Sequence, residues 1–179
     1  MWDGVIATGI VTHYFRFTPR HRNFVALEFS GAYRQRTPFQ LLLGVPEGGV
    51  RCYEQSHFAG GQRLVSRIEE RYVFGNIFGA ADAGFAMFTD VGKQWSGDVP
   101  FGVTTPVKAS IGVSLLAAIP PRSARRWRAA LAFPLSAGAN ARWTLTFTNA
   151  DRTQFVFRNA RDVAEGREIT VPSSIFAWP

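Results

Sequence analysis

Arg51 and Asp90 of this 179-residue sequence could form an arginine–carboxylate ion pair. Arg51 lies in a stretch, residues 34–60, that is far longer than a turn requires, and Asp90 lies near the end of an alternating apolar segment. A guanidinium can donate two hydrogen bonds to one carboxylate. Ordering a long loop costs conformational entropy unless a contact holds it. We therefore expect Arg51 to pair with Asp90, although Arg51 taken alone would be interpreted as a solvated loop charge.

Residue types for catalysis or metal binding do not occur in the required patterns. Asp82 and Asp90 share a face of one predicted strand but would lie about 27 Å apart, too far for an acid/base pair. The single cysteine, Cys52, excludes an internal disulfide and a cysteine-based zinc site, and the three histidines lack ligand spacing. Residues 79–84 are read as strand rather than as a phosphate-binding loop. We expect no enzyme activity, no cofactor and no metal.

The composition favours a β-rich protein. Sixteen Phe, five Trp, 17 Gly and ten Pro suit many strands and turns. Hydrophobic residues make up 46% of the chain, yet no run approaches the roughly 18 apolar residues of a membrane helix. The net charge is +7, but the arginines fall mostly on alternate positions within strands rather than in one run. This distribution argues against nucleic acid as a partner.

Apolar residues alternate with polar ones over seven segments, the first of which, from about Val5 to Phe17, alternates least clearly. Period two predicts strands and places neighbouring side chains on opposite faces. We therefore expect an all-β, antiparallel up-and-down meander of seven or eight long strands. Residues expected on the outward apolar face include Val113, Leu115, Leu131, Phe133, Leu145 and Phe147. Residues expected on the concave face include Arg63, Arg67, Glu69, Arg71, Asp90 and Arg128.

Strand length and loop length favour a transmembrane β-barrel over a soluble one. Alternation alone also fits a soluble sandwich or a lipocalin-like barrel. However, most predicted strands have about 10 to 15 residues, where about 5 to 6 is usual and about 9 to 11 cross a membrane. Short connections at 18–21, 75–77 and 120–123 alternate with long ones at 34–60 and 93–106, as in outer-membrane barrels. Tyr33, Tyr72, Trp127 and Trp143 fall near strand ends, as in an aromatic girdle.

Five short motifs follow one another along the chain. They are Val50-Arg51-Cys52-Tyr53 after Gly48-Gly49, Glu69-Glu70-Arg71, Phe88-Thr89-Asp90-Val91-Gly92, Ile111-Gly112-Val113-Ser114-Leu115 and Ala132-Phe133-Pro134-Leu135. In this order the run from Leu41 to Leu135 resembles the C-terminal half of the barrel in the bacterial surface antigen superfamily. That superfamily comprises outer-membrane protein assembly factors and two-partner secretion transporters. Cys52 stands where the family motif has glycine, so a positive φ there would strain the chain.

The resemblance implies a fold and a function. Residues 1–157 would form the C-terminal half of an outer-membrane barrel, with loop 34–60 folded into the lumen. The residues themselves, not the resemblance, predict a tail at 158–179 with one extra edge strand, because Pro172 confines a strand there to an edge. Arg51 would meet Asp90, with Glu69 as its next-best partner and Tyr53 against the lumen wall. The implied site residues are Arg51, Tyr53, Asp90, Gly92, Phe88, Glu69 and Arg71.

The implied function is that of a barrel module of a protein-insertion or polypeptide-secretion machine. The expected location is the cell outer membrane. The expected partners are membrane lipid and unfolded outer-membrane or secreted polypeptides. No secretory signal opens the sequence, so we expect the chain to be an incomplete piece of such a protein. The alternative is a small ligand-binding β-barrel, soluble or membrane-bound, without a transport role.

Overall fold

The protein is all-β. The structure, a computed structural model, describes residues 4–34, 41–43, 49–53, 59–121, 126–136 and 141–150. The strands are β1 (Val5–Arg16), β2 (His21–Tyr33), β3 (Leu41–Leu42), β4 (Ala59–Gly60), β5 (Gln62–Ile77), β6 (Ala81–Trp95), β7 (Lys108–Ala118), β8 (Arg126–Pro134) and β9 (Thr144–Ala150). No helix long and apolar enough to cross a bilayer occurs in these ranges. The predicted tail at 158–179 lies outside the described residues.

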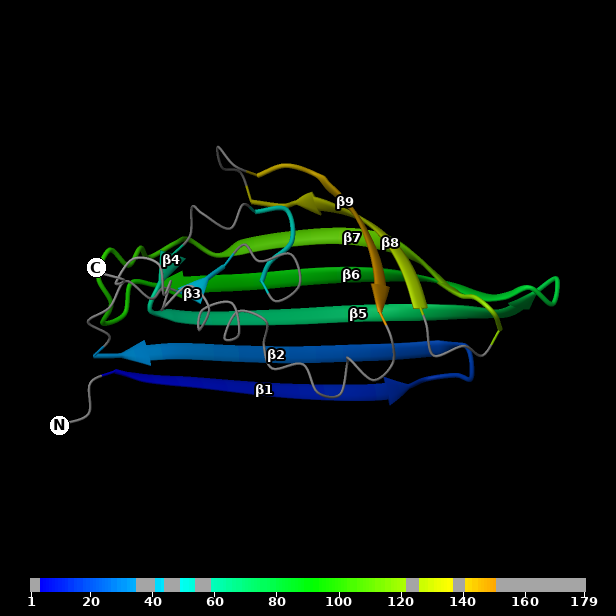
Figure 1. Cartoon of the computed structure of the whole chain (residues 1–179), viewed down its shortest axis with the longest axis horizontal. Coiled ribbons are helices and arrows are strands. Elements are labelled where there is room, and N and C mark those ends of the chain that lie inside the picture. Colours follow the sequence, from blue (N-terminus) through cyan, green and yellow to red (C-terminus); the bar gives the residue numbers. More distant parts are fainter. Residues whose placement is uncertain are drawn as a thin grey trace, which may run out of the picture.

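Seven long strands form one antiparallel sheet in the order β1-β2-β5-β6-β7-β8-β9, and β3 pairs with β4 beside it. The predicted up-and-down meander of seven strands is therefore confirmed. The sheet is curved, and β8 and β9 bend over in front of the earlier strands (Figure 1). It is not closed, because β1 and β9 remain its two edges. Closure into a barrel is thus not present in the described part of the chain.

The connections gather by length at the two ends of the sheet. The turns after β1, β5 and β7 lie at one end, here called the short-turn end, and the longer connections after β2 and β6 lie at the other (Figure 1). Two predicted boundaries were wrong. Residues 75–77 belong to β5, and the turn is at 78–80, because Gly75, with φ +94°, marks a register irregularity inside the strand. The long connection predicted at 93–106 begins only after Trp95.

The two faces of the sheet differ sharply in exposure, as the alternation predicted. Val113 is 50% exposed and Leu115 68%, whereas Ser114 between them is 2% exposed. Of the six side chains predicted on the apolar face, five are exposed and Leu131 is half-buried. On the opposite face Arg63, Glu69 and Asp90 are buried. We call the face of these charged residues the concave face and the apolar one the outer face.

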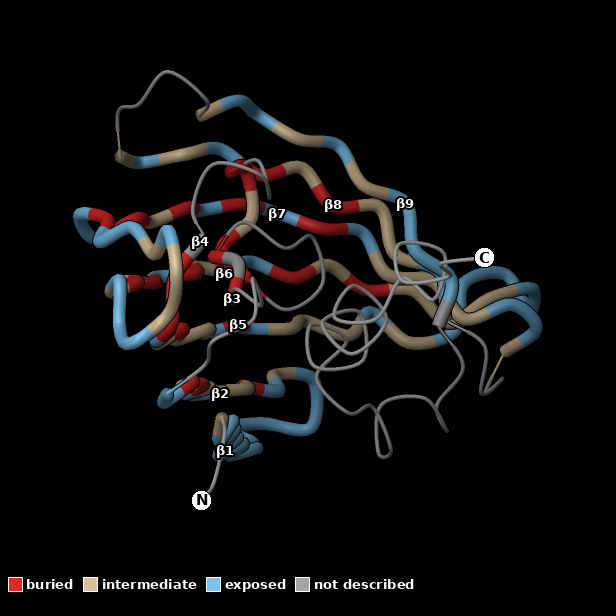
Figure 2. Tube along the Cα trace, turned by 60° about the vertical axis from the view of Figure 1, so that its left-hand side comes forward, coloured by how far each residue is buried: buried red, intermediate tan, exposed pale blue. Residues whose placement is uncertain are grey.

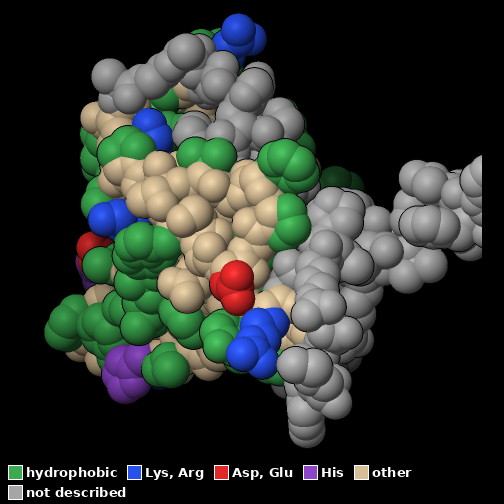
Figure 3. All heavy atoms as spheres, turned by 90° about the vertical axis from the view of Figure 1, so that its left-hand side faces the viewer, with side chains coloured by type: hydrophobic (Ala, Val, Ile, Leu, Met, Phe, Trp, Pro, Cys, Tyr) green, Lys and Arg blue, Asp and Glu red, His purple; other side chains and the backbone are tan. Residues whose placement is uncertain are grey.

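Burial is concentrated in the middle strands. Figure 2 shows buried residues mainly on β5 to β8, while β1 is exposed along most of its length. Viewed from the end with the longer connections, hydrophobic side chains gather along one side of the molecule (Figure 3). The sheet therefore turns its apolar side outward and its charged side inward, which is the reverse of a water-soluble sheet.

Candidate functional site

Residues 49–53, here called the loop tip, lie on the concave face. Val50 is completely buried and donates its backbone N–H to the carbonyl of Leu43 (2.9 Å). The carbonyl of Cys52 accepts a hydrogen bond from the backbone N–H of Arg142 (3.2 Å). Val50 packs in one apolar cluster with Leu43 and Val65 of β5. The tip of the long loop is thus held both by the sheet and by the connection that precedes β9.

Arg51 reaches Asp90 of β6 through two hydrogen bonds. The Nε atom donates to Oδ2 (2.5 Å) and one terminal nitrogen, Nη2, donates to Oδ1 (2.8 Å). The Asp90 side chain is fully buried and that of Arg51 is 11% exposed. This is the bidentate arrangement that makes arginine–carboxylate pairs strong and orientation-specific. The structure therefore brings together the two side chains that the sequence paired.

Arg67 of β5 is a second partner of Asp90. Its Nε donates to Oδ1 of Asp90 (3.0 Å), and its Nη2 donates to the carbonyl of Gly49 in the loop tip (3.0 Å). Arg67 and Asp90 stand directly opposite each other in the β5–β6 register. The Asp90 carboxylate thus binds both Arg51 of the loop and Arg67 of β5, and Arg67 also binds the loop backbone at Gly49. The alternation predicts Arg67 on this face but does not indicate its role as a partner of Asp90.

Phe88 forms the surface on which the Arg51 guanidinium rests. The Cζ atom of Arg51 lies 3.3 Å from the centre of the Phe88 ring, and the Cζ atom of Arg128 lies 5.4 Å from it. Phe88 is 2% exposed, so the cation–π contact is sheltered from water. A Cβ atom on Gly112 of β7 would collide with this ring. The absence of a side chain at Gly112, part of the fourth motif, therefore leaves room for the Phe88 ring.

Gly92, two residues after Asp90, lets the loop approach the sheet. A Cβ atom there would lie 2.5 Å from Cγ2 of Val50 and 2.8 Å from Cδ1 of Leu43. Both atoms belong to the buried cluster under the loop tip. The glycine that ends the third motif is therefore where the close packing of loop and strand demands the absence of a side chain.

Tyr53 lies on the concave face and is 5% exposed. Its hydroxyl donates to the carbonyl of Ala109 at the start of β7 (2.9 Å) and accepts from the backbone N–H of Ser136 (3.3 Å). The ammonium of Lys108 lies 5.4 Å from its ring centre. Tyr53 thus ties the loop tip to β7 and to the connection after β8, as the expected contact with the wall implies.

Glu69 forms its ion pairs with arginines other than Arg51. Its two carboxylate oxygens bind Arg71 of the same strand (2.5 Å) and Arg128 of β8 (2.9 Å). The guanidinium of Arg51 is occupied by Asp90 and Phe88, so the prediction that Glu69 is its next-best partner stays a prediction. Glu69 is 1% exposed and connects β5 with β8 across the curve of the sheet. The sequence offers no signal for this contact, since it depends on that curvature.

Cys52 adopts a positive φ of 75°, a conformation that is costly for a residue with a Cβ atom. Its thiol is buried beside Phe88, Ala130 and Ala132 and lies 3.6 Å from the Thr144 hydroxyl. Burial raises the pKa of the Cys52 thiol above its usual value. This chain therefore places a buried cysteine with a strained backbone at a positive-φ position of the loop tip.

The charged groups of the concave face are paired where they are most buried. Arg63 is fully buried and forms an ion pair with Glu28 of β2. A buried charge without a partner is strongly destabilising, so these pairs are needed for the charged side chains of the concave face to be buried. Among the described residues there is no group of three or more His, Cys, Asp or Glu side chains that could hold a metal ion. The geometry is that of a structural anchor.

Comparisons of the chain with protein-family models, curated proteins and solved structures give no match.

Proposed function

We propose that this chain is the membrane-embedded sheet of an outer-membrane β-barrel module, which serves a protein-insertion or polypeptide-secretion machine. The observation that carries the proposal is the inverted sheet, with large apolar side chains exposed on the outer face and ionised side chains buried on the concave face. Leu115 and Phe147 are 68% and 75% exposed, while Arg63 and Asp90 are fully buried. Leaving a Leu or Phe side chain in water forgoes about 1.5 to 3 kcal/mol, so contact with lipid tails accounts for the outer face.

The concave face identifies which side of the sheet would meet the bilayer. A charged side chain facing lipid near the bilayer midplane costs up to about 2 to 4 kcal/mol for Arg or Lys. Only the outer face is therefore compatible with lipid. The five longest strands have 11 to 16 residues, enough to cross the hydrocarbon layer when tilted.

The two free edges require further strands in a membrane. Unpaired backbone groups along β1 and β9 could not remain exposed to lipid, so a barrel must close between them. In a seven-stranded meander β1 and β9 run in the same direction. An antiparallel barrel then needs an odd number of additional strands between the two edges. A second copy of these seven strands inserted in the same orientation would create parallel seams, so the closing strands are not supplied by such a copy.

The loop-tip site supports the more specific part of the proposal. The resemblance to the bacterial surface antigen superfamily implies that a long loop is anchored inside the lumen by an arginine on an aspartate. Here Arg51, Asp90, Phe88, Gly92 and Tyr53 are gathered around one loop tip. An anchor of this kind holds a loop inside the space through which an unfolded polypeptide would pass. The proposed partners are accordingly membrane lipid and unfolded outer-membrane or secreted polypeptides.

The membrane orientation is tested by a pair of adjacent cysteine labels. In a Cys52→Ser background, Leu115→Cys and Ser114→Cys carry an environment-sensitive fluorophore after the protein is folded into phosphatidylcholine vesicles. We expect nitroxide-labelled lipids to quench the label at 115 strongly and the label at 114 weakly, because the two side chains point to opposite faces. Equal quenching at both positions would contradict the proposal.

The machine function is tested by the rate at which an unfolded outer-membrane β-barrel polypeptide folds into vesicles. We expect vesicles containing the protein to accelerate this folding relative to protein-free vesicles, and Asp90→Ala to reduce the acceleration. If vesicles with correctly inserted protein show no acceleration, the membrane assignment would stand and the machine assignment would fail.

A further inference from the structure

Three arginines stand side by side across the first strands of the sheet. Arg16 of β1 is the register partner of Arg22 of β2, and Arg22 is the register partner of Arg71 of β5. Directly opposed residues of neighbouring strands project from the same face, with Cβ atoms about 4.5 to 5.5 Å apart. Because Arg71 lies on the concave face with Glu69, all three do. We call Arg16, Arg22 and Arg71 the arginine ladder.

The ladder carries more positive charge than the neighbouring carboxylate compensates. Arg71 shares the carboxylate of Glu69 with Arg128, so one anion serves two guanidinium groups. Arg16 and Arg22 are exposed, and within the described part of the chain neither has an ion-pair partner. The Nη2 atom of Arg128 is buried and donates no hydrogen bond to any described atom. Like charges directly opposite each other in a sheet are destabilising, so the ladder is held at a cost.

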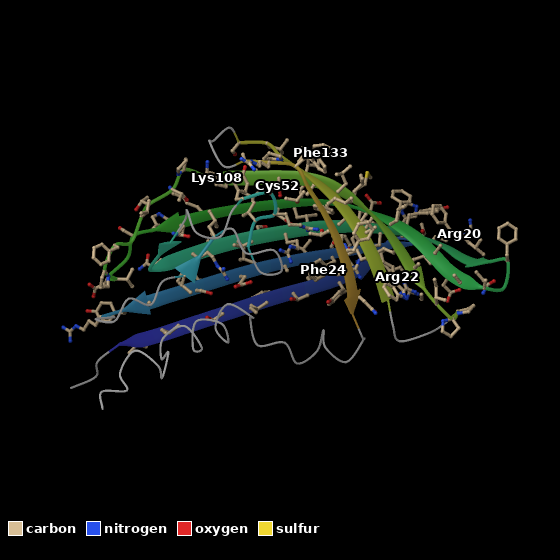
Figure 4. The ribbon with its side chains drawn as sticks, turned by 45° about the horizontal axis from the view of Figure 1, so that its top comes forward. Arg20, Arg22, Phe24, Cys52, Lys108 and Phe133 are labelled. Atoms are coloured by element: carbon tan, nitrogen blue, oxygen red, sulfur yellow. The ribbon has the colours of Figure 1, made fainter. Side chains whose placement is uncertain are left out.

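Aromatic rings line the neighbouring row on the same face. Two residues along each strand from the ladder, Tyr14 is the register partner of Phe24, and Phe24 is the register partner of Glu69. The rings of Tyr14 and Phe24 lie 5.1 Å apart, and the Cζ atom of Arg71 lies 5.8 Å from the Phe24 ring centre. Figure 4 shows Arg22 and Phe24 on β2, toward the short-turn end where Arg20 lies. Rings beside guanidinium groups limit their freedom and favour a defined orientation.

We propose that the arginine ladder is a docking site for the carboxylates of an acidic polypeptide segment. In an extended segment, side chains on one face repeat about every 6.6 Å, which flexible arginine side chains spaced about 4.8 Å apart can match. Arginine binds such carboxylates with paired hydrogen bonds. This inference deepens the proposed function, because it names the chemistry of a polypeptide that the sheet would receive at its short-turn end.

A lipid phosphate and a nucleic acid fit the ladder less well. The ladder lies on the concave face, so a bilayer against the outer face could not present headgroups to it. The row spans only three neighbouring strands, whereas nucleic-acid surfaces are extended basic stripes with many phosphate contacts.

The test measures binding of fluorescently labelled hexaglutamate to the full chain in detergent micelles by fluorescence anisotropy. We expect Arg16→Gln/Arg22→Gln to weaken binding by about tenfold or more, since two of the three guanidinium groups that would bind carboxylates are lost. The matched control, Arg34→Gln/Arg142→Gln, removes two exposed arginines elsewhere. It should weaken binding less than about twofold, because exposed charges far from a ligand are screened. Arg22→Gln alone serves as a milder variant that preserves Arg16.

Three results would overturn the inference. One is the absence of hexaglutamate binding by the native chain, and another is an equal loss in the ladder and control variants. The third is a tighter, ladder-dependent binding of oligothymidylate or of phosphatidylglycerol vesicles, which would assign the site to a phosphate. Because the assay is done in micelles, it separates the two proposals: ladder-dependent binding without quenching at position 115 in vesicles would retain the inference and reject the membrane assignment.

Discussion

The loop-tip site and the arginine ladder lie on the same face and use arginine in opposite ways. At the loop tip, Arg51 and Arg67 share one buried carboxylate, and Arg51 also rests on the Phe88 ring. At the ladder, Arg16 and Arg22 are exposed and no carboxylate of the described residues compensates them. The charges of the loop tip are neutralised by a carboxylate of the chain itself, whereas Arg16 and Arg22 could be neutralised by carboxylates of a bound partner.

This difference separates a stabilising role from a binding role. A buried ion pair whose partners are both present holds its geometry, and losing one partner leaves a costly charge. Exposed like charges add nothing to the fold, and their repulsion lowers its stability. Substitutions at the loop tip should therefore weaken the fold strongly, and substitutions of Arg16 or Arg22 should leave it intact or strengthen it.

The largest effect is expected at Asp90. Asp90→Ala leaves Arg51 and Arg67 without their shared carboxylate, which should lower the free energy of unfolding by about 3 to 5 kcal/mol. Urea unfolding of the protein in detergent micelles measures it. In a double-mutant cycle, Arg51→Ala should cost much less in the Asp90→Ala background than in the native one. Additive effects of the two substitutions would show that the contact is not an anchor.

Gly92 should respond next most strongly. Gly92→Ala places a Cβ atom 2.5 Å from Val50 and 2.8 Å from Leu43, so the loop tip must shift. Such overpacking costs about 1 to 3 kcal/mol, and the loop should become more sensitive to protease. Gly9→Ala on β1 is the matched control, since nothing lies within 4 Å of its added Cβ atom. Equal protease sensitivity of the two variants would contradict close packing of the loop at Gly92.

Cys52 separates backbone strain from side-chain packing. Both Cys52→Gly and Cys52→Ala remove the buried thiol, but only glycine tolerates the φ of 75° without strain. Cys52→Gly should therefore be more stable than Cys52→Ala by about 1 to 2 kcal/mol, the reverse of the usual order in a strand. Thermal unfolding of the two variants in the same detergent measures the difference. If alanine is the more stable, the loop tip does not demand this conformation.

The alternation of side chains predicted the strands and their faces well, because a period of two is a local property of the sequence. It predicted the end of β5 poorly, because Gly75 is a turn signal that the structure uses inside a strand. The pairing of Arg51 with Asp90 came from the residue types and the motif order. The alternation alone would have placed only Asp90.

Contacts that depend on strand register or sheet curvature lay beyond the sequence. Arg67 joins Asp90 because the two are opposite in the β5–β6 register, and Arg128 joins Glu69 because β8 bends over the concave face. The arginine ladder is of the same kind. Alternation places each of its members on a face, but only the pairing of β1, β2 and β5 aligns them.

The smallest change in stability is expected at the ladder, and it should be an increase, opposite in sign to the changes at the loop tip. Arg22→Gln removes the middle charge between Arg16 and Arg71, so the free energy of unfolding should rise by about 0.2 to 1 kcal/mol at low salt. The gain should shrink as salt screens the repulsion. The control Arg142→Gln should change stability by less than about 0.5 kcal/mol, as is usual for exposed positions. Urea unfolding at low and high salt measures both. A loss of stability in Arg22→Gln would mean that Arg22 already has a partner within the chain, and the ladder would then belong with the loop tip as part of the fold's own support.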